Sequence, residues 1–236
     1  MKKILLIIPA YNEEENVLKV YNTIKNYNEK NEQKLDYVFI NDGSKDSTLK
    51  ILEENNLNHI NLINNLGIGG AVQTGYKYAH ENNYDIAVQF DGDGQHDINY
   101  VIKICEPLID GQVDMCIGTR YLDKSSSKFQ STFMRRLGAN IISMFIKICC
   151  GVRITDPTSG LRMVNRDVMK IFAYDYPKDY PEPESVVAIL RQKKNVEEIP
   201  VIMKAREGGV SSISPKKSVY YMIKVTLAIL IERIRK

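Results

Sequence analysis

The segment Ile86-Ala87-Val88-Gln89-Phe90-Asp91-Gly92-Asp93 joins a short, continuous apolar run to two carboxylates. A run of this length that does not alternate with polar residues is typical of a strand covered on both faces of a sheet. Four similar runs are found at Ile4–Pro9, Tyr37–Ile40, Ile60–Ile63 and Met115–Ile117. Helical patterns lie between these runs, at Glu14–Tyr27, Ser47–Glu54, Gly70–Glu81 and Asn99–Ile109. This alternation predicts an α/β fold whose mostly parallel, Rossmann-like sheet is flanked by helices.

The two carboxylates stand where ligands bind in such a sheet, at the carboxyl end of a strand. Asp91 and Asp93 are one residue apart in a glycine-containing turn, and Gln95 and His96 follow them. Hard oxygen ligands of this kind suit Mg²⁺ or Mn²⁺ bridged to a diphosphate. Asp-Gly pairs also form ordinary surface turns, which is the alternative interpretation.

The ends of the first three strands carry polar and glycine residues as well. Tyr11, in Pro9-Ala10-Tyr11-Asn12-Glu13, offers a ring on which a base could stack. Asp42 ends the second strand, where its carboxylate can accept hydrogen bonds from a nucleobase or a ribose. Gly67-Ile68-Gly69-Gly70 would allow close backbone approach to a ligand at a helix start. It is not a dinucleotide fingerprint, because Val72 occupies the position of the third glycine.

The second half of the chain does not continue the regular alternation of apolar runs and helical patterns. A helix is predicted at Thr132–Cys150, with Arg135 and Arg136 near its start, and a turn at Asp156-Pro157-Thr158-Ser159-Gly160. The remaining elements are a short helix, a strand and a final helix, predicted at Glu184–Lys194, Glu198–Met203 and Lys217–Arg235.

The 236 residues carry a net charge of only +3, but the two halves of the chain differ in sign. Residues 1–119 hold ten lysines, no arginine and 18 acidic residues, which gives a net charge of −8. Residues 120–236 hold 22 basic and 11 acidic residues, which gives +11. An acidic half can host a metal, and an arginine-bearing half can bind phosphate or an anionic membrane surface. The hydrophobic content of 44% excludes a disordered chain.

Cysteine usage and the N-terminus both predict a protein that stays in the cytoplasm. The four cysteines form no CxxC motif, and with only three histidines they argue against a zinc cluster or a disulfide framework. The run Ile4–Ile8 is too short for a signal peptide. No window reaches the ~20 uninterrupted apolar residues of a transmembrane helix.

Four motifs, in this order, make the chain resemble the family-2 glycosyltransferases: Pro9-Ala10-Tyr11-Asn12-Glu13-Glu14, Asn41-Asp42-Gly43-Ser44-Lys45-Asp46, Asp91-Gly92-Asp93-Gly94-Gln95-His96 and Asp156-Pro157-Thr158-Ser159-Gly160-Leu161-Arg162. The chain is most similar to the polyprenyl- and dolichyl-phosphate sugar synthases. The resemblance implies a GT-A fold, inversion at the anomeric carbon, a nucleotide-sugar donor, and Mg²⁺ or Mn²⁺. It also implies a GT-A domain over residues 1–214, with a nucleotide-sugar half (1–119) and an acceptor half (120–214), before an amphipathic helix at 215–236.

The same motifs imply roles for individual residues. Those expected to bind the substrates are Pro9, Tyr11, Glu13, Asp42, Gly67, Asp91, Arg135, Asp156 and Ser159. Those expected to ligate the metal are Asp91, Asp93 and Gln95. Those expected to take part in catalysis are Arg120, Arg136 and Glu184. Arg120 matches a position that faces the donor and acceptor phosphates, and either Arg135 or Arg136 matches the arginine of the lipid-phosphate synthases.

Glu182 and Glu184 bear on the nature of the acceptor. A hydroxyl acceptor needs a carboxylate as general base, and Glu184 is better placed by motif than Glu182. A phosphate acceptor is already largely ionised near neutral pH and needs no base. Glutamates in the first turn of a helix also stabilise it through its dipole, which is the structural alternative.

The end of the chain predicts attachment to a membrane. Val219–Ile231 is apolar except for Lys224 and Thr226, and basic residues flank it. Thirteen residues give a helix of roughly 20 Å, short of the ~30 Å hydrocarbon core, so an interfacial helix fits better than a spanning one. The alternative is a helix packed on the domain or on a second subunit.

We therefore expect an enzyme: an inverting, metal-dependent hexosyltransferase at the cytoplasmic face of the cell membrane. Its donor would be a nucleoside-diphosphate sugar, with a UDP-sugar favoured, its acceptor polyprenyl phosphate, and its context cell-wall polysaccharide synthesis. One alternative is transfer to a sugar hydroxyl of a lipid-linked cell-surface polysaccharide. Another is a nucleotide-sugar-binding protein without turnover. A homo-oligomer stays open, and no nucleic acid is expected as a partner.

Overall fold

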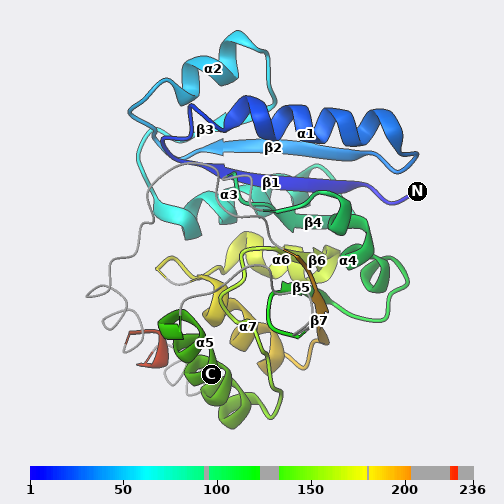
Figure 1. The fold of residues 1–236 in the computed structure, drawn as a ribbon, viewed down its shortest axis with the longest axis vertical. Coiled ribbons are helices and arrows are strands. Elements are labelled where there is room, and N and C mark those ends of the chain that lie inside the picture. The colour runs from blue at the N-terminus through cyan, green and yellow to red at the C-terminus, as the bar shows by residue number, and fades with distance from the viewer. Residues whose placement is uncertain (93–95, 123–132, 180, 203–223, 228–236) are drawn as a thin grey trace.

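The computed structural model describes residues 1–92, 96–122, 133–179, 181–202 and 224–227, which form one α/β unit around a seven-stranded sheet (Figure 1). The strands are β1 (Ile4–Ala10), β2 (Leu35–Asn41), β3 (His59–Asn61), β4 (Ile86–Gln89), β5 (Met115–Thr119), β6 (Arg162–Asn165) and β7 (Val196–Pro200). The helices are α1 (Val17–Lys30), α2 (Thr48–Glu54), α3 (Gly67–Glu81), α4 (Asn99–Ile109), α5 (Phe133–Cys150), α6 (Arg166–Tyr174) and α7 (Pro181–Arg191). The predicted α/β class is confirmed, and the strand order is β3-β2-β1-β4-β6-β5-β7.

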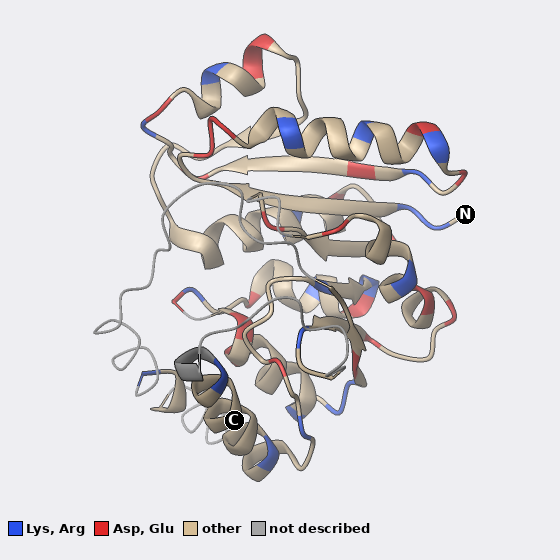
Figure 2. Ribbon diagram, in the orientation of Figure 1, with Lys and Arg blue, Asp and Glu red and all other residues tan. Residues whose placement is uncertain are grey.

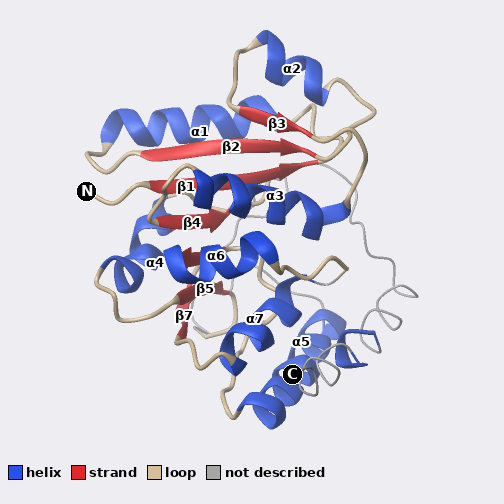
Figure 3. Cartoon of the chain, turned by 180° about the vertical axis from the view of Figure 1, so that it is seen from behind, coloured by secondary structure: helices blue, strands red, loops and turns tan. Residues whose placement is uncertain are grey.

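The apolar runs form strands because both faces of the sheet are covered. Along β1, Leu6 and Ile8 pack with side chains of α1 and α4, whereas Leu5 and Ile7 pack with those of α3 and α6. Figure 3 shows α3, α6 and α7 on one side of the sheet. The pairs β1–β2, β1–β4, β2–β3 and β5–β7 are parallel. Their carboxyl ends therefore meet at one edge, as predicted for the site.

The prediction missed one strand and one helix. Strand β6 runs antiparallel between β4 and β5, and α6 begins directly after it, capped by the Asn165 side chain, which accepts a hydrogen bond from Val168 N. Only four residues long, β6 begins with an arginine and ends with an asparagine, so it lacks the apolar run that marks the other strands. Because of its direction, the turn at 156–160 arrives at the carboxyl end of β4.

Several predicted boundaries also shift. Helix α7 begins at Pro181, three residues early, and tolerates Pro183 because the first helical turn needs no backbone N–H donors. Strand β7 begins at Val196. Of the predicted final helix, the described residues are Lys224–Leu227, which are helical. The division at 214 therefore stays a prediction. Within the described ranges, no helix is long and apolar enough to cross a membrane.

Candidate active site

The loops after β1 and β2 are fastened to each other. Asn12 N donates to Ser44 Oγ at 3.0 Å, and Glu13 N donates to Thr48 Oγ1 at 2.9 Å. Asn12 has φ 56°, a left-handed conformation that asparagine tolerates better than most residues. Tyr11, next to it, keeps 44% of its surface exposed, so its ring is accessible, and stacking on a ligand stays a prediction. The Glu13 carboxylate accepts a hydrogen bond from Asn16.

Asp42 is buried and holds the loop that leads into α3. Its Oδ1 accepts the backbone N–H of Leu66 at 2.7 Å. Burial raises the pKa of Asp42, and the backbone N–H groups of Leu66 and Gly67 oppose that rise. Gly67, the first residue of α3, has φ +77° and open space where a Cβ would stand. Asp42 thus fixes the backbone directly before Gly67, at the start of α3, and its carboxylate is used for a hydrogen bond within the protein.

Asp91 lies at the carboxyl end of β4 with 34% of its side chain exposed. His96 Nε2 lies 3.0 Å from its Oδ2. Burial alone would raise the pKa of Asp91, but the His96 hydrogen bond, together with the positive charge of Arg120, lowers it. A Cβ on Gly160 would lie 2.4 Å from Asp91 Oδ2, so any other residue there would displace the Asp91 carboxylate. The carboxylate is therefore ionised, reachable and tightly confined.

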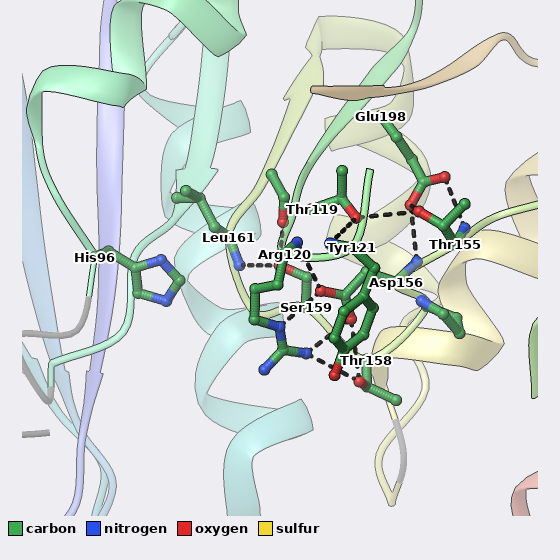
Figure 4. Close-up of polar contacts among 12 residues, drawn as sticks. His96, Thr119, Arg120, Tyr121, Thr155, Asp156, Thr158, Ser159, Leu161 and Glu198 are labelled. Carbon is green, nitrogen blue, oxygen red and sulfur yellow. Dashed lines mark hydrogen bonds and ion pairs between the residues drawn. The ribbon is translucent and has the colours of Figure 1, made fainter. Parts of the chain in front are cut away.

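Arg120, which follows β5, is clamped by Asp156. Its Nε and Nη2 donate to the two carboxylate oxygens of Asp156 at 2.7 Å each, and its backbone N–H donates to Oδ2 at 3.1 Å. Asp156 is fully buried, and the side chain of Arg120 is 19% exposed. Figure 4 shows Nη1, the other end of the guanidinium, pointing away from Asp156 on the side of His96. A two-pronged ion pair of this kind fixes the direction of the remaining donors.

Tyr121 brings two arginines together. The guanidinium carbon of Arg120 lies 5.4 Å from the centre of the Tyr121 ring, and that of Arg136 lies 5.9 Å from the same centre. Both distances are within the range of cation–π attraction. Arg136, in the first turn of α5, is exposed. Arg136 thus shares an aromatic partner with Arg120, and the side chain of Arg135, the other predicted alternative, lies outside the described part.

The turn at 156–160 forms hydrogen bonds with other parts of the protein. The buried Ser159 donates from Oγ to Gly118 O at 2.6 Å, which ties the turn to β5. Arg162 is fully buried and donates to Pro157 O, Ser159 O and Ser185 Oγ. It also donates to Glu182 O. Asp156 and Ser159 therefore shape the site, and a buried arginine anchors the start of α7 beside it.

The glutamate Glu182 interacts electrostatically with two charged residues of the site, Arg162 and Asp91. Burial raises the pKa of Glu182, the positive charge of Arg162 opposes this, and the negative charge of Asp91 adds to the rise. Glu184, two residues further along α7, is half-buried. The charges of Glu182 and Asp91 thus interact.

The predicted metal ligands Asp93 and Gln95 lie outside the described residues. Among the residues that are described, no group of three or more His, Cys, Asp and Glu side chains is arranged to hold a metal. Asp91 fits the chemistry of a hard divalent ion, because its carboxylate is ionised and partly exposed. The described part of the site therefore supplies one suitable ligand.

Sequence reasoning missed Tyr121, Arg162 and Glu198 as parts of the site. Tyr121 follows Arg120 directly, so an aromatic residue beside a candidate phosphate ligand was a readable signal. Arg162 and Glu198 carried none, because their roles depend on pairing between segments far apart in the chain.

Comparison with known proteins identifies relatives over nearly the whole length. The model of glycosyl transferase family 2 matches residues 5–172. The UDP-N-acetylglucosamine–dolichyl-phosphate N-acetylglucosaminyltransferase of Methanococcus voltae is 33% identical over 220 residues, which cover 85% of each chain. The polyprenol monophosphomannose synthase of Mycolicibacterium smegmatis is 24% identical over 233 residues, covering 95% of this chain and 86% of the relative.

Solved structures show the same fold. The glucosyl-3-phosphoglycerate synthase of Mycobacterium tuberculosis, in complex with UDP, superimposes with a TM-score of 0.72, at 14% identity, over 100% of this chain and 81% of that one. The same synthase, solved with Mn²⁺, UDP and glucosyl-3-phosphoglycerate, gives a TM-score of 0.69 at 15% identity, over 98% of this chain and 80% of that one. The GT-A fold implied by the sequence motifs is thereby confirmed.

Proposed function

The chain belongs to glycosyl transferase family 2 and is a glycosyltransferase, and we propose that it moves a hexose from a nucleoside-diphosphate sugar to polyprenyl phosphate. One observation supports a phosphate acceptor. Arg120 and Arg136 both contact the ring of Tyr121, and the positive charge of Arg120 lowers the pKa of Asp91. Two guanidinium groups at one aromatic ring, one of which acts electrostatically on the Asp91 carboxylate, suit a phosphate nucleophile. The names of the relatives from Methanococcus voltae and Mycolicibacterium smegmatis point to the same acceptor class.

The residues divide the work as follows. Tyr11, Glu13, Pro9 and Gly67 line the nucleoside end, and Asp91 holds the ribose or metal end of the donor. A divalent ion, Mg²⁺ or Mn²⁺, held by Asp91, Asp93 and Gln95, would neutralise the leaving diphosphate.

The transfer itself exchanges one bond for another. An oxygen of the lipid phosphate, oriented by Arg120 and Arg136, forms a bond to C1 of the sugar. The bond from C1 to the diphosphate oxygen breaks, the nucleoside diphosphate leaves with its electron pair, and C1 is inverted. No proton has to be removed from an ionised phosphate, so the step needs cations and no carboxylate base.

A thermal-shift panel tests the donor and the metal. We expect a UDP-sugar with Mn²⁺ to raise the Tm, because a ligand that binds the folded state stabilises it by mass action. At a concentration of about 100 Kd the stabilisation would be about 2.7 kcal/mol. Chelator should abolish most of the shift, and GDP- and ADP-sugars serve as matched controls. An equal Tm with every nucleotide sugar would contradict the proposed donor site.

A second candidate keeps the donor and changes the acceptor to a sugar hydroxyl. Glu182 favours it, because its raised pKa and its electrostatic contact with Asp91 are those of a carboxylate beside the reacting centre. In that case Glu182 or Glu184 would be the general base.

We further propose that the enzyme works on an anionic membrane surface, at its cytoplasmic face. Helix α5 supports this: Leu137, Met144 and Ile148 are exposed on it, beside Arg136 and Lys147. The sequence of α5 contains no acidic residue, and Figure 2 shows basic residues and no acidic ones along its ribbon. An exposed apolar stripe with basic neighbours is the pattern of an interfacial helix. A role in cell-wall polysaccharide synthesis would follow from such a lipid-linked product.

Vesicle sedimentation tests the membrane proposal. Truncation after Ser214 and the double change Met144→Glu with Ile148→Glu are each expected to release the protein from anionic vesicles, since both remove apolar surface and the second adds negative charge. Raising the salt concentration should weaken binding of the full chain. Tyr174→Glu, which places one negative charge on an exposed residue of α6, is the control and should sediment like the unaltered chain. Unchanged sedimentation of both altered chains would refute the proposal.

A further inference from the structure

Strand β7, at the edge of the sheet, carries two adjacent glutamates in different environments. Glu197 is exposed, whereas Glu198 is partly buried. In the parallel ladder with β5, Glu198 stands opposite Ile117, two residues before Thr119 at the end of β5. Glu198 thus lies one strand away from the segment that carries Arg120.

The Glu198 carboxylate gathers three hydrogen bonds from one short segment (Figure 4). Its Oε2 accepts from Thr155 N at 2.6 Å, and its Oε1 accepts from Thr155 Oγ1 at 2.9 Å and from Asp156 N at 2.8 Å. All three partners donate, so the site calls for a group that only accepts. A carboxylate meets that need, and an amide does not, because one end of an amide can only donate.

The next link in this chain of contacts is Asp156. While its backbone N–H is held by Glu198, its carboxylate receives three hydrogen bonds from Arg120. Thr155 Oγ1 also lies 3.1 Å from Thr119 Oγ1, directly before Arg120. The turn that begins at Asp156 ends at Gly160, which is pressed against Asp91. One edge-strand carboxylate therefore fixes the segment that bounds both Arg120 and Asp91.

Among the described residues, the recorded hydrogen-bond donors to the Glu198 side chain belong to Thr155 and Asp156. Among the residues that the structure describes, no lysine or arginine forms an ion pair with Glu198; the basic partner in this network, Arg120, pairs with Asp156 instead. Hydrogen bonds to an ionised acceptor are stronger than those between neutral groups. These hydrogen bonds therefore stabilise one position of the segment Thr155-Asp156.

We propose that Glu198 is a positioning residue for glycosyl transfer: by holding Thr155 and Asp156 it sets the direction of the Arg120 guanidinium. Glu198 touches no substrate in this account, and it acts through Asp156. The proposal rests on the proposed function only in that Arg120 must serve the transfer step.

The test compares Glu198→Gln with Glu197→Gln, which makes the same chemical change on the neighbouring, exposed residue. Glu198→Gln should lower kcat by about 10–100-fold, the usual cost of removing a residue that orients a ligand-contacting group. The Kd of UDP should change less than kcat does, because Tyr11 and Gly67, at the proposed nucleoside end, are not in the network, and Asp91 only borders it. Glu197→Gln should match the unaltered enzyme in both quantities. Turnover is measured as release of nucleoside diphosphate, with circular dichroism and Tm as folding controls.

A double-mutant cycle separates positioning from general destabilisation. In an Arg120→Ala background, Glu198→Gln should lower the residual rate by less than about twofold, because the group that it positions is gone. An equally large loss in both backgrounds would overturn the proposal, as would full activity of Glu198→Gln.

A milder pair of variants keeps the test valid if Glu198→Gln does not fold. Thr155→Val removes one of the three donors at nearly constant volume and should lower kcat, whereas Thr155→Ser keeps the hydroxyl and should restore it. Equal rates for these two variants would overturn the proposal. If the unaltered enzyme releases no nucleoside diphosphate with polyprenyl phosphate, the acceptor proposal fails; Glu198 is then tested with whichever acceptor supports turnover.

Discussion

Asp91→Asn is expected to lower kcat by at least about 10²-fold, on the scale of losing one preorganised electrostatic stabiliser. Asparagine keeps the shape that Gly160 confines and removes the negative charge. That charge is present throughout the neutral range, because the contact with His96 and the charge of Arg120 hold the pKa of Asp91 below its ordinary value against the effect of burial. The loss should appear in the rate of nucleoside-diphosphate release at saturating donor and metal.

The matched control is Asp110→Asn, which makes the same change at the exposed end of α4 and should leave the rate unaltered. The stability of the two variants gives a second check. A carboxyl group with a lowered folded-state pKa contributes stability above its unfolded pKa, and this is lost as the pH falls through the folded value. The difference in unfolding free energy between the unaltered chain and Asp91→Asn should therefore shrink in acid, below about pH 4. Full activity of Asp91→Asn, or activity undiminished in excess chelator, would contradict the metal role.

Arg136→Ala is expected to cost more than Glu184→Gln when polyprenyl phosphate is the acceptor. The arginine supplies one of the two cations at Tyr121, and loss of a charge-assisted contact made to the reacting phosphate should lower kcat/KM by about 10- to 100-fold. Glu184→Gln should stay within about threefold, because an ionised phosphate needs no general base. The pH–rate profile should then lack a limb set by a carboxylate.

Arg153→Ala is the control for Arg136→Ala, since Arg153 is an exposed arginine just beyond the end of α5. Glu182→Gln belongs beside Glu184→Gln, because the charge of Asp91 reaches Glu182. For a hydroxyl acceptor the order reverses, and the loss of a general base would cost about 10²–10⁴-fold. A folded, active Arg136→Ala enzyme beside an inactive glutamate variant would contradict the phosphate acceptor.

The parts of the fold that could be predicted are those with a local pattern. Strands β1, β2, β4 and β5 are buried on both faces, so their continuous apolar runs are visible in the sequence. Strand β6 is equally buried but begins with Arg162, whose charge is satisfied by backbone carbonyls and Ser185 more than 20 residues away or in the preceding turn. From the sequence alone, a buried arginine of this kind is predicted to be a surface residue, because its hydrogen-bond partners become known only from the structure.

The candidate site divides in the same way. Asp91 could be predicted because it ends an apolar strand, and Tyr11 because it follows one. The clamp between Arg120 and Asp156 joins residues 36 positions apart, and the hold of Glu198 on Thr155 spans 43. Nothing in the local sequence distinguishes Glu198 from Glu197, since the difference arises only when β7 pairs with β5. The local sequence thus predicts the groups that we propose to contact the ligand, whereas the groups that hold them in place required the structure.

The most direct test of the phosphate acceptor is a transfer assay with two matched lipids. The full chain is incubated with Mn²⁺, a sugar-labelled panel of nucleoside-diphosphate sugars, and vesicles that contain either polyprenyl phosphate or the corresponding polyprenol. We expect label to enter the phosphorylated lipid alone, with one nucleoside diphosphate released for each sugar transferred. Label that enters polyprenol or a lipid-linked glycan, with none in polyprenyl phosphate, would contradict it.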